Sequence, residues 1–74
     1  MIEWTEAYNI HRAKIGSTLT LICEWESGGY KVMAAGGVRI NKLINLVPNL
    51  DEAKRKTIKL GKKTLEESLK IIDS

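Results

Sequence analysis

The spacing of apolar residues changes once along this chain, and this change restricts the fold more than any other feature. In residues 18–26 polar and apolar side chains alternate, with apolar residues at Leu19, Leu21, Cys23 and Trp25. A period of two is typical of a β-strand with one buried face. After Pro48, which ends the preceding segment, apolar and small residues recur with the period of 3.6 of an amphipathic helix. The two patterns together predict an α+β fold.

Glycines divide the first half at intervals that are typical of a β-meander. They lie at Gly16 and at two pairs, residues 28–29 and 36–37. The first pair, preceded by Ser27, supplies the positive φ angles of a tight hairpin turn. The second pair indicates either another turn or a bulge inside one long strand. We therefore expect an antiparallel meander of three to four strands over about residues 4–44.

Two segments of this half are less regular. Residues 8–15 are expected to form the first strand, but the apolar positions change parity within it, which indicates a bulge near His11 and Arg12. Residues 40–47 fit the spacing of a helix and also fit the end of a strand followed by a covering loop. The interpretation as strand plus loop is slightly favoured.

The second half predicts one long helix over about residues 50–72. Asn49 and Glu52 have the N-x-x-E spacing close to that of a capping box, and acidic residues suit the positive end of a helix. Gly61 lies within the apolar stripe, where glycine costs about 1 kcal/mol relative to alanine, so we expect a close approach of helix and sheet there. The stripe consists of Leu50, Ala53, Thr57, Leu60, Gly61, Thr64, Leu65, Ser68, Ile71 and Ile72.

The length of 74 residues predicts a single domain with a small core, over residues 1–74. Cys23 is the only cysteine, which excludes an internal disulfide, and no residues have the spacing of a structural zinc site. Proteins with a small core often gain stability by forming a homodimer, and this alternative stays open. Residues 1–9 show no signal peptide and no apolar run approaches the length of a membrane span, so we expect a cytoplasmic protein with no membrane partner.

The residue types that carry catalysis are sparse and scattered. His11 is the only histidine, and a general base needs an oriented partner and a substrate pocket. Cys23 alternates in phase with Leu21, which predicts a core position. The glycine pairs lack the further residues of a phosphate-binding loop. We therefore expect a protein that is not an enzyme and that needs no metal and no cofactor.

The first candidate binding surface is a basic face on the helix. Residues 54–63 contain six basic groups and no acid, so they supply all of the net charge of +3. Such a face contacts the phosphates of nucleic acid, docks on an acidic protein, or only faces solvent, and the sequence leaves these alternatives open. The six residues are Lys54, Arg55, Lys56, Lys59, Lys62 and Lys63.

The second candidate surface is the sheet face that the helix leaves open. Even-numbered residues of the strand at 18–26 point to it if the odd-numbered ones face the helix. The next strand adds either the Tyr30, Val32 and Ala34 set or the Lys31, Met33 and Ala35 set, depending on register. An apolar patch on an open sheet commonly marks a protein contact. The residues assigned to this surface are Ile22, Glu24, Met33 and Arg39.

Two short motifs resemble known families. Gly-Gly-Tyr-x-Val at residues 28–32 and the Leu-x-Glu-Ala-Lys that opens the helix at residues 50–54 resemble the strand-and-helix half of HicB-type antitoxins and small βββα proteins of phages and mobile elements. Some proteins of that class inhibit bacterial defence systems, anti-CRISPR proteins among them. Residues 51–56 are also similar to the start of the second helix of a double-stranded-RNA-binding domain, where Lys54, Arg55 and Lys56 would contact phosphates.

These features lead to two functional expectations. The resemblance implies a small binding protein that inhibits or modulates a host protein or ribonucleoprotein complex, such as a CRISPR effector, by direct protein binding. The alternative is a module that binds nucleic acid through the basic face of the helix.

Overall fold

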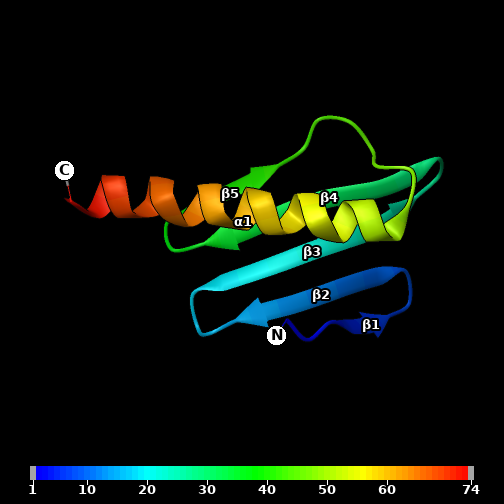
Figure 1. Ribbon diagram of the computed structural model, residues 1–74, viewed down its shortest axis with the longest axis horizontal. Coiled ribbons are helices and arrows are strands. Elements are labelled where there is room, and N and C mark those ends of the chain that lie inside the picture. Colours follow the sequence, from blue (N-terminus) through cyan, green and yellow to red (C-terminus); the bar gives the residue numbers. More distant parts are fainter. Residues whose placement is uncertain (1, 74) are drawn as a thin grey trace.

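A five-stranded antiparallel sheet and one long helix make up the chain, and the computed structural model describes residues 2–73 (Figure 1). The strands follow one another across the sheet in sequence order, which is a meander. The predicted α+β arrangement is confirmed, with a short first strand that raises the number of strands to five. The elements are β1 (Thr5–Ala7), β2 (Ile10–Ile15), β3 (Leu19–Glu26), β4 (Gly29–Gly36), β5 (Arg39–Lys42) and α1 (Leu50–Asp73).

The bulge predicted near His11 and Arg12 is wrong. Pairing between β2 and β3 runs without interruption from Ile10 opposite Glu24 to Ile15 opposite Leu19. Tyr8 lies in the turn between β1 and β2, with a φ of 59° and an exposed side chain. The apolar parity changes within β2 because Ile10 lies on the face away from α1 whereas Ala13, opposite buried Leu21, lies on the face toward it.

Short turns connect the central strands. Gly37, with a φ of 59°, lies in the turn between β4 and β5, so the second glycine pair marks a turn and not a bulge. After β5 the chain continues as a loop, which confirms the interpretation of residues 40–47 as strand plus loop. Val47 anchors this loop by exchanging two backbone hydrogen bonds with Tyr30, at 2.7 and 2.9 Å.

The helix begins at the predicted position. The side-chain oxygen of Asn49 accepts a hydrogen bond of 2.8 Å from the backbone N–H of Glu52, which caps the first turn. α1 packs on β3, β4 and β5, and its C-terminal turns run past the end of the sheet (Figure 1). Ile71 and Ile72 are therefore 49% and 65% exposed, and their assignment to the inner stripe was wrong.

The core lies between α1 and the sheet, and small residues bring the two layers close together. A Cβ atom on Gly61 would lie 2.7 Å from the terminal methyl carbon Cδ2 of Leu21, so the predicted close approach is confirmed. The hydroxyls of the polar residues in the inner stripe are hydrogen-bonded: Thr64 donates to the carbonyl of Leu60 within the helix at 2.7 Å, and Ser68 donates to the carbonyl of Gly36 on β4 at 2.6 Å. The buried apolar residues are Ala13, Leu19, Leu21, Cys23, Val32, Ala34, Val47, Ala53 and Leu60.

Candidate functional site

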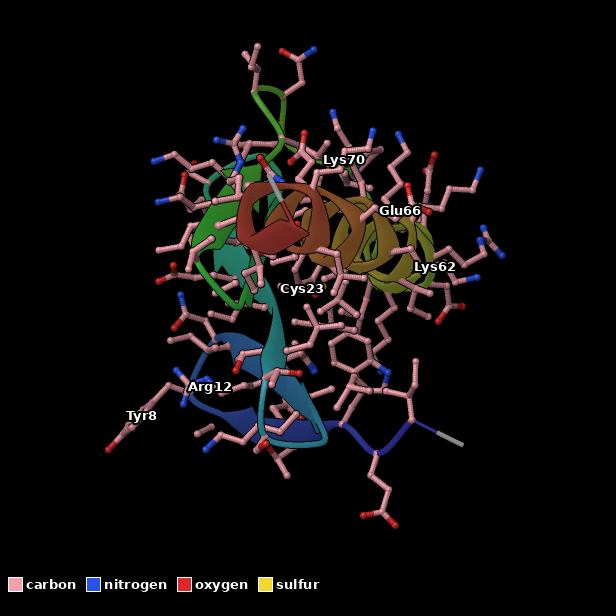
Figure 2. The ribbon with its side chains drawn as sticks, turned by 90° about the vertical axis from the view of Figure 1, so that its left-hand side faces the viewer. Tyr8, Arg12, Cys23, Lys62, Glu66 and Lys70 are labelled. Carbon is pink, nitrogen blue, oxygen red and sulfur yellow. The ribbon has the colours of Figure 1, made fainter. Side chains whose placement is uncertain are left out.

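Three exposed cations form a row along the outer side of α1. At 100° per residue, Arg55, Lys59 and Lys62 point within about 60° of one another. The same geometry places them opposite Thr57 and Thr64, which are completely buried against the sheet. Figure 2 shows Lys62 on the side of the helix that faces away from the sheet. These three side chains, called the outer row below, are all exposed.

The other three predicted basic residues lie on the flanks of α1. Lys56 and Lys63 lie on the flank next to the loop that follows β5. Lys54 lies on the opposite flank, where its Nζ is 5.3 Å from the centre of the Trp4 ring, a cation–π distance. The six residues therefore surround the exposed part of the helix and do not share a single face.

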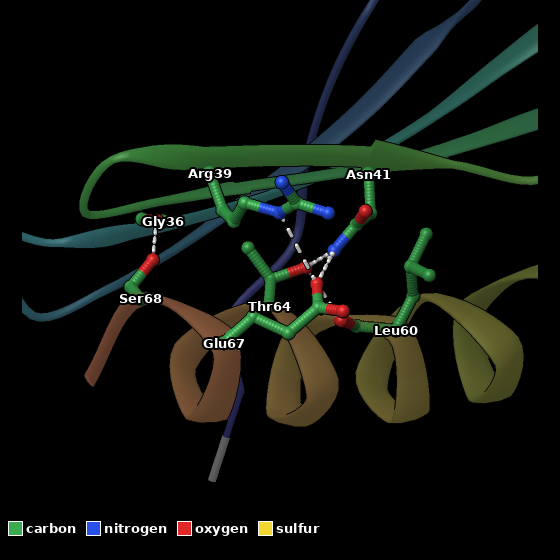
Figure 3. A network of polar contacts seen from close by, with 7 residues as sticks. All are labelled: Gly36, Arg39, Asn41, Leu60, Thr64, Glu67 and Ser68. Atoms are coloured by element: carbon green, nitrogen blue, oxygen red, sulfur yellow. Dashed lines mark hydrogen bonds and ion pairs between the residues drawn. The ribbon is translucent and has the colours of Figure 1, made fainter. Parts of the chain in front are cut away.

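The acidic residues of α1 leave most of this positive charge uncompensated. Among the side chains that the structure describes, Lys56 is the one member of the six with an ion pair, to Glu52 at 3.5 Å. Glu67 instead accepts hydrogen bonds from Asn41 at 2.8 Å and Arg39 at 3.4 Å (Figure 3). The hydrogen bond from Asn41, aided by the charge of Arg39, lowers the pKa of Glu67. Among the described side chains, no carboxylate forms an ion pair with Arg55, Lys59 or Lys62.

A hollow of about 370 Å³ adjoins the basic residues between α1 and the loop after β5. Lys56 and Lys63 line one side of it and Lys42 lines the other, with Asn41 and Asn45 between them. Ile44, at the tip of the loop, is fully exposed. This hollow extends the positive surface of the helix toward the edge of the sheet.

The register of the sheet settles which residues occupy its open face. Ile22 lies opposite Met33 and Glu24 opposite Lys31, with all four on the side away from α1. The set that contains Lys31, Met33 and Ala35 therefore takes the open face. Three of the four predicted residues of this surface lie there.

Arg39 does not, and this prediction was wrong. The turn after β4 places Arg39 opposite Gly36, whose position faces the helix, and the guanidinium bonds Glu67 of α1. The open face instead includes five residues that the sequence analysis did not assign to it, because the register of β2 and β5 was unknown. They are Ile10, Arg12, Lys14, Ile40 and Lys42. An alternation that starts at Ile10 would have identified the first three.

The reactive residue types are held in structural contacts. His11 lies with its Nε2 3.5 Å from a carboxylate oxygen of Glu6, and its ring packs edge-on against Tyr30. Cys23 is completely buried, its Sγ is 2.9 Å from the hydroxyl oxygen of Thr57, and burial raises the pKa of the thiol. Within the described part of the chain, no group of three His, Cys, Asp or Glu residues could hold a metal ion.

Comparison with protein-family models, with curated proteins and with solved structures finds no match to this chain. In residues 2–73, no helix is both long enough and apolar enough to cross a membrane. The functional conclusion therefore depends on the geometry of the two surfaces.

Proposed function

We propose that this protein is a non-enzymatic binding module that contacts the phosphate backbone of nucleic acid through α1. The observation that carries this proposal is the outer row of Arg55, Lys59 and Lys62, which is exposed, lies opposite the buried stripe and has no ion-pair partner among the described residues. Cations that a fold does not use for its own stability are free to replace the counterions of a polyanion.

The length of the basic segment fits several phosphates. From Lys54 to Lys63 the helix rises about 14 Å. Duplex DNA carries one phosphate per about 3.4 Å of axis on each strand, so this length spans about four base pairs. Long flexible side chains on one helix would reach about three to five of these phosphates. The contact would be to the backbone and would therefore depend little on base sequence.

The flanking lysines can join this contact at small cost. The ion pair between Lys56 and Glu52 is exposed to solvent, with both side chains more than a third accessible. Exposed pairs of this kind contribute at most about 1 kcal/mol, so Lys56 can exchange its carboxylate for a phosphate. Lys63 and Lys42 border the adjoining hollow and would extend the track toward β5.

A second candidate function retains a host complex as the partner. The same cationic helix would dock on an acidic protein surface of a host complex, such as a CRISPR effector, and inhibit that complex by direct protein binding. An acidic protein would also attract the outer row by its negative charge, whereas the length of the basic segment matches the phosphate spacing of nucleic acid. Binding to isolated nucleic acid separates them.

Fluorescence anisotropy with labelled duplex DNA, single-stranded DNA and RNA at about 50 mM salt tests the proposal, because phosphate contacts are strongest there. We expect the wild-type chain to bind, and the triple variant Arg55→Glu, Lys59→Glu, Lys62→Glu to bind more than about 100-fold more weakly. Circular dichroism should show an unchanged fold, since all three residues are exposed.

A matched pair of single substitutions provides the control. Lys62→Glu and Lys70→Glu change the net charge equally on the same helix, but Lys70 lies outside the basic segment. Only Lys62→Glu should weaken binding strongly. Absence of binding by the wild-type chain to all three nucleic acids would reject the proposal and leave the acidic protein surface as the remaining partner.

A further inference from the structure

The open face of the sheet carries a diagonal apolar stripe that crosses four strands. Ile10 starts it on β2, Ile22 on β3 and Met33 on β4 continue it, and Ala35 lies opposite Ile40 on β5 at its far end. Ile40 is 70% exposed, and α1 covers the other face. The other four members of the stripe are half-buried, so the stripe is a continuous, partly accessible apolar strip on the face that α1 leaves uncovered. Covering such a strip with apolar surface is favourable in water.

The charged residues on the two sides of the stripe differ. Arg12 and Lys14 on β2 border one side, and Figure 2 shows Arg12 on the opposite side of the molecule from Lys62. Glu24, Lys31 and Lys42 border the other side. Lys31 is paired with Glu26 of its own chain at 3.6 Å. Among the described residues, neither Arg12 nor Glu24 has an ion pair within the chain.

We propose that a second copy of this chain occupies the open face and forms a two-fold symmetric dimer, with stripe packed on stripe. A two-fold axis in the interface plane and parallel to the stripe turns the partner over and exchanges its two borders. The partner's Arg12 then lies over Glu24, and the partner's Glu24 lies over Arg12. The two Arg12–Glu24 contacts make this part of the face complementary to itself in charge.

The distances between residues on the sheet are consistent with contacts between Arg12 of one chain and Glu24 of the other. With strands about 4.8 Å apart and same-face neighbours about 7 Å apart along a strand, Arg12 and Glu24 lie about 5 Å and 3 Å to either side of the stripe. They also lie at nearly the same position along it, near its Ile10 end. The stripe runs at about 45° to the strands, so the strands of the two sheets would cross at about 90°, a known mode of sheet packing.

The surface area that the two open faces would bury fits a weakly associating dimer. Five strands of this length cover a flat footprint of about 400 Å² per chain, or about 800 Å² for the pair, and the accessible surface of uneven side chains exceeds the flat footprint. This is below the roughly 1,200 Å² of stable interfaces and is typical of weak ones, so the dimer should dissociate on dilution. Both helices would remain on the outside, where each outer row stays available to a polyanion.

The mass of the full chain in solution tests the dimer, by sedimentation equilibrium from about 1 to 200 µM. We expect a shift with concentration from 8.3 kDa for one chain to twice that value. Arg12→Glu and Glu24→Arg should each be folded by circular dichroism and dissociate at least about tenfold more easily, because each homodimer now contains two like-charged contacts. Met33→Lys, with a charge in the stripe, should also be monomeric.

An equimolar mixture of Arg12→Glu and Glu24→Arg distinguishes contacts between chains from contacts within one chain. In the mixed dimer, the glutamate introduced at position 12 of one chain meets the arginine introduced at position 24 of the other. At the second contact the unchanged Arg12 and Glu24 meet, so both contacts become attractive again. Native mass spectrometry should show mainly the mixed dimer. A wild-type chain that is monomeric at about 200 µM, single variants that dimerise like wild type, or a mixture that stays monomeric would each overturn the proposal.

Discussion

At the scale of single residues, Cys23 shows how burial controls a titratable group. Burial raises the pKa of its thiol above the ordinary value of 9.0, although the hydrogen bond with Thr57 and the charge of Lys54 oppose this. The unfolded chain therefore loses the thiol proton at a lower pH than the folded chain. The thiol's contribution to stability is complete below about pH 9 and is lost as the pH rises through the folded-state pKa.

The corresponding prediction compares the wild-type chain with Cys23→Ala. Urea unfolding at pH 7 should show the variant to be less stable by about 1 kcal/mol, because a buried group is removed. Between about pH 9 and pH 11 the wild-type chain should lose stability more steeply than the variant, and the difference between the two should shrink. Parallel pH profiles for the two proteins would contradict this account of Cys23.

Gly61 provides a second prediction at this scale. Gly61→Ala should gain about 1 kcal/mol of helix propensity but lose about 1–3 kcal/mol by overpacking, because the new methyl group would meet buried Leu21. We expect a net loss of about 1 kcal/mol in the free energy of unfolding. Lys62→Ala, at the exposed neighbouring position, should change stability little. A clear stabilisation by Gly61→Ala would show that the two layers are not in close contact.

The surroundings of a residue could be predicted from the sequence where they depend on local backbone geometry. They could not be predicted where they depend on the register of the strands. Gly61 could be assigned to a close approach because glycine is unfavourable in a helix without such a reason. Arg39 could not be placed, because the side that it faces depends on the number of residues in the preceding turn. A change of one residue there moves every following side chain to the other face.

At the scale of elements, α1 is attached to β5 by polar contacts as well as by the core. Asn41 donates hydrogen bonds to both Thr64, at 3.0 Å, and Glu67, at 2.8 Å (Figure 3). Ser68 adds a bond to the end of β4. These contacts fix how far α1 is rotated about its axis, and thereby direct the outer row away from the sheet.

Replacement of Glu67 tests this attachment. Glu67→Gln removes the charge that Asn41 and Arg39 stabilise, so the variant should be less stable than the wild-type chain at pH 7. Because the pKa of Glu67 is lowered from 4.5, its contribution is present above about pH 4.5 and is lost as the pH falls through the lower folded-state value. The urea midpoints of the two proteins should therefore converge as the pH falls below the folded-state pKa of Glu67. A difference of equal size at neutral and acidic pH would contradict the role of the charge.

The helix and the central strands could be predicted from periodicity, but the edges of the elements could not. The Asn49 cap located the start of α1 within one residue. The apolar period that included Ile71 and Ile72 contained no information about where the sheet ends beneath the helix. Similarly, the three residues of β1 are too few to show a period, and their pairing with β2 depends on the turn at Tyr8.

At the scale of the whole molecule, the two layers leave two surfaces with different chemistry. The outer side of α1 is cationic, and the open face of the sheet is apolar with charged borders. The basic segment could be found from the sequence because its residues are contiguous on one helix. The stripe could not, since its members come from four strands and meet only through the register.

The proposed dimer would have two separate surfaces for the proposed binding of polyanions. The molecule is 17 Å thick in its shortest dimension, so packing two sheets face to face places the outer rows on opposite sides of the pair. A single duplex could not contact both rows at once. We therefore expect the dimer to join two nucleic-acid segments, and the monomeric variants to bind one segment through the same row.

The dependence of duplex affinity on salt concentration tests the central claim most directly, because it counts the phosphates that are contacted. For about three to five phosphates, a plot of log affinity against log salt should have a slope of about −2.7 to −4.5. Arg55→Gln and Lys62→Gln should each make this slope less steep by about one, whereas Lys70→Gln should leave it unchanged. A slope near zero, or slopes that Arg55→Gln and Lys62→Gln do not alter, would contradict binding of nucleic acid through the outer row of α1.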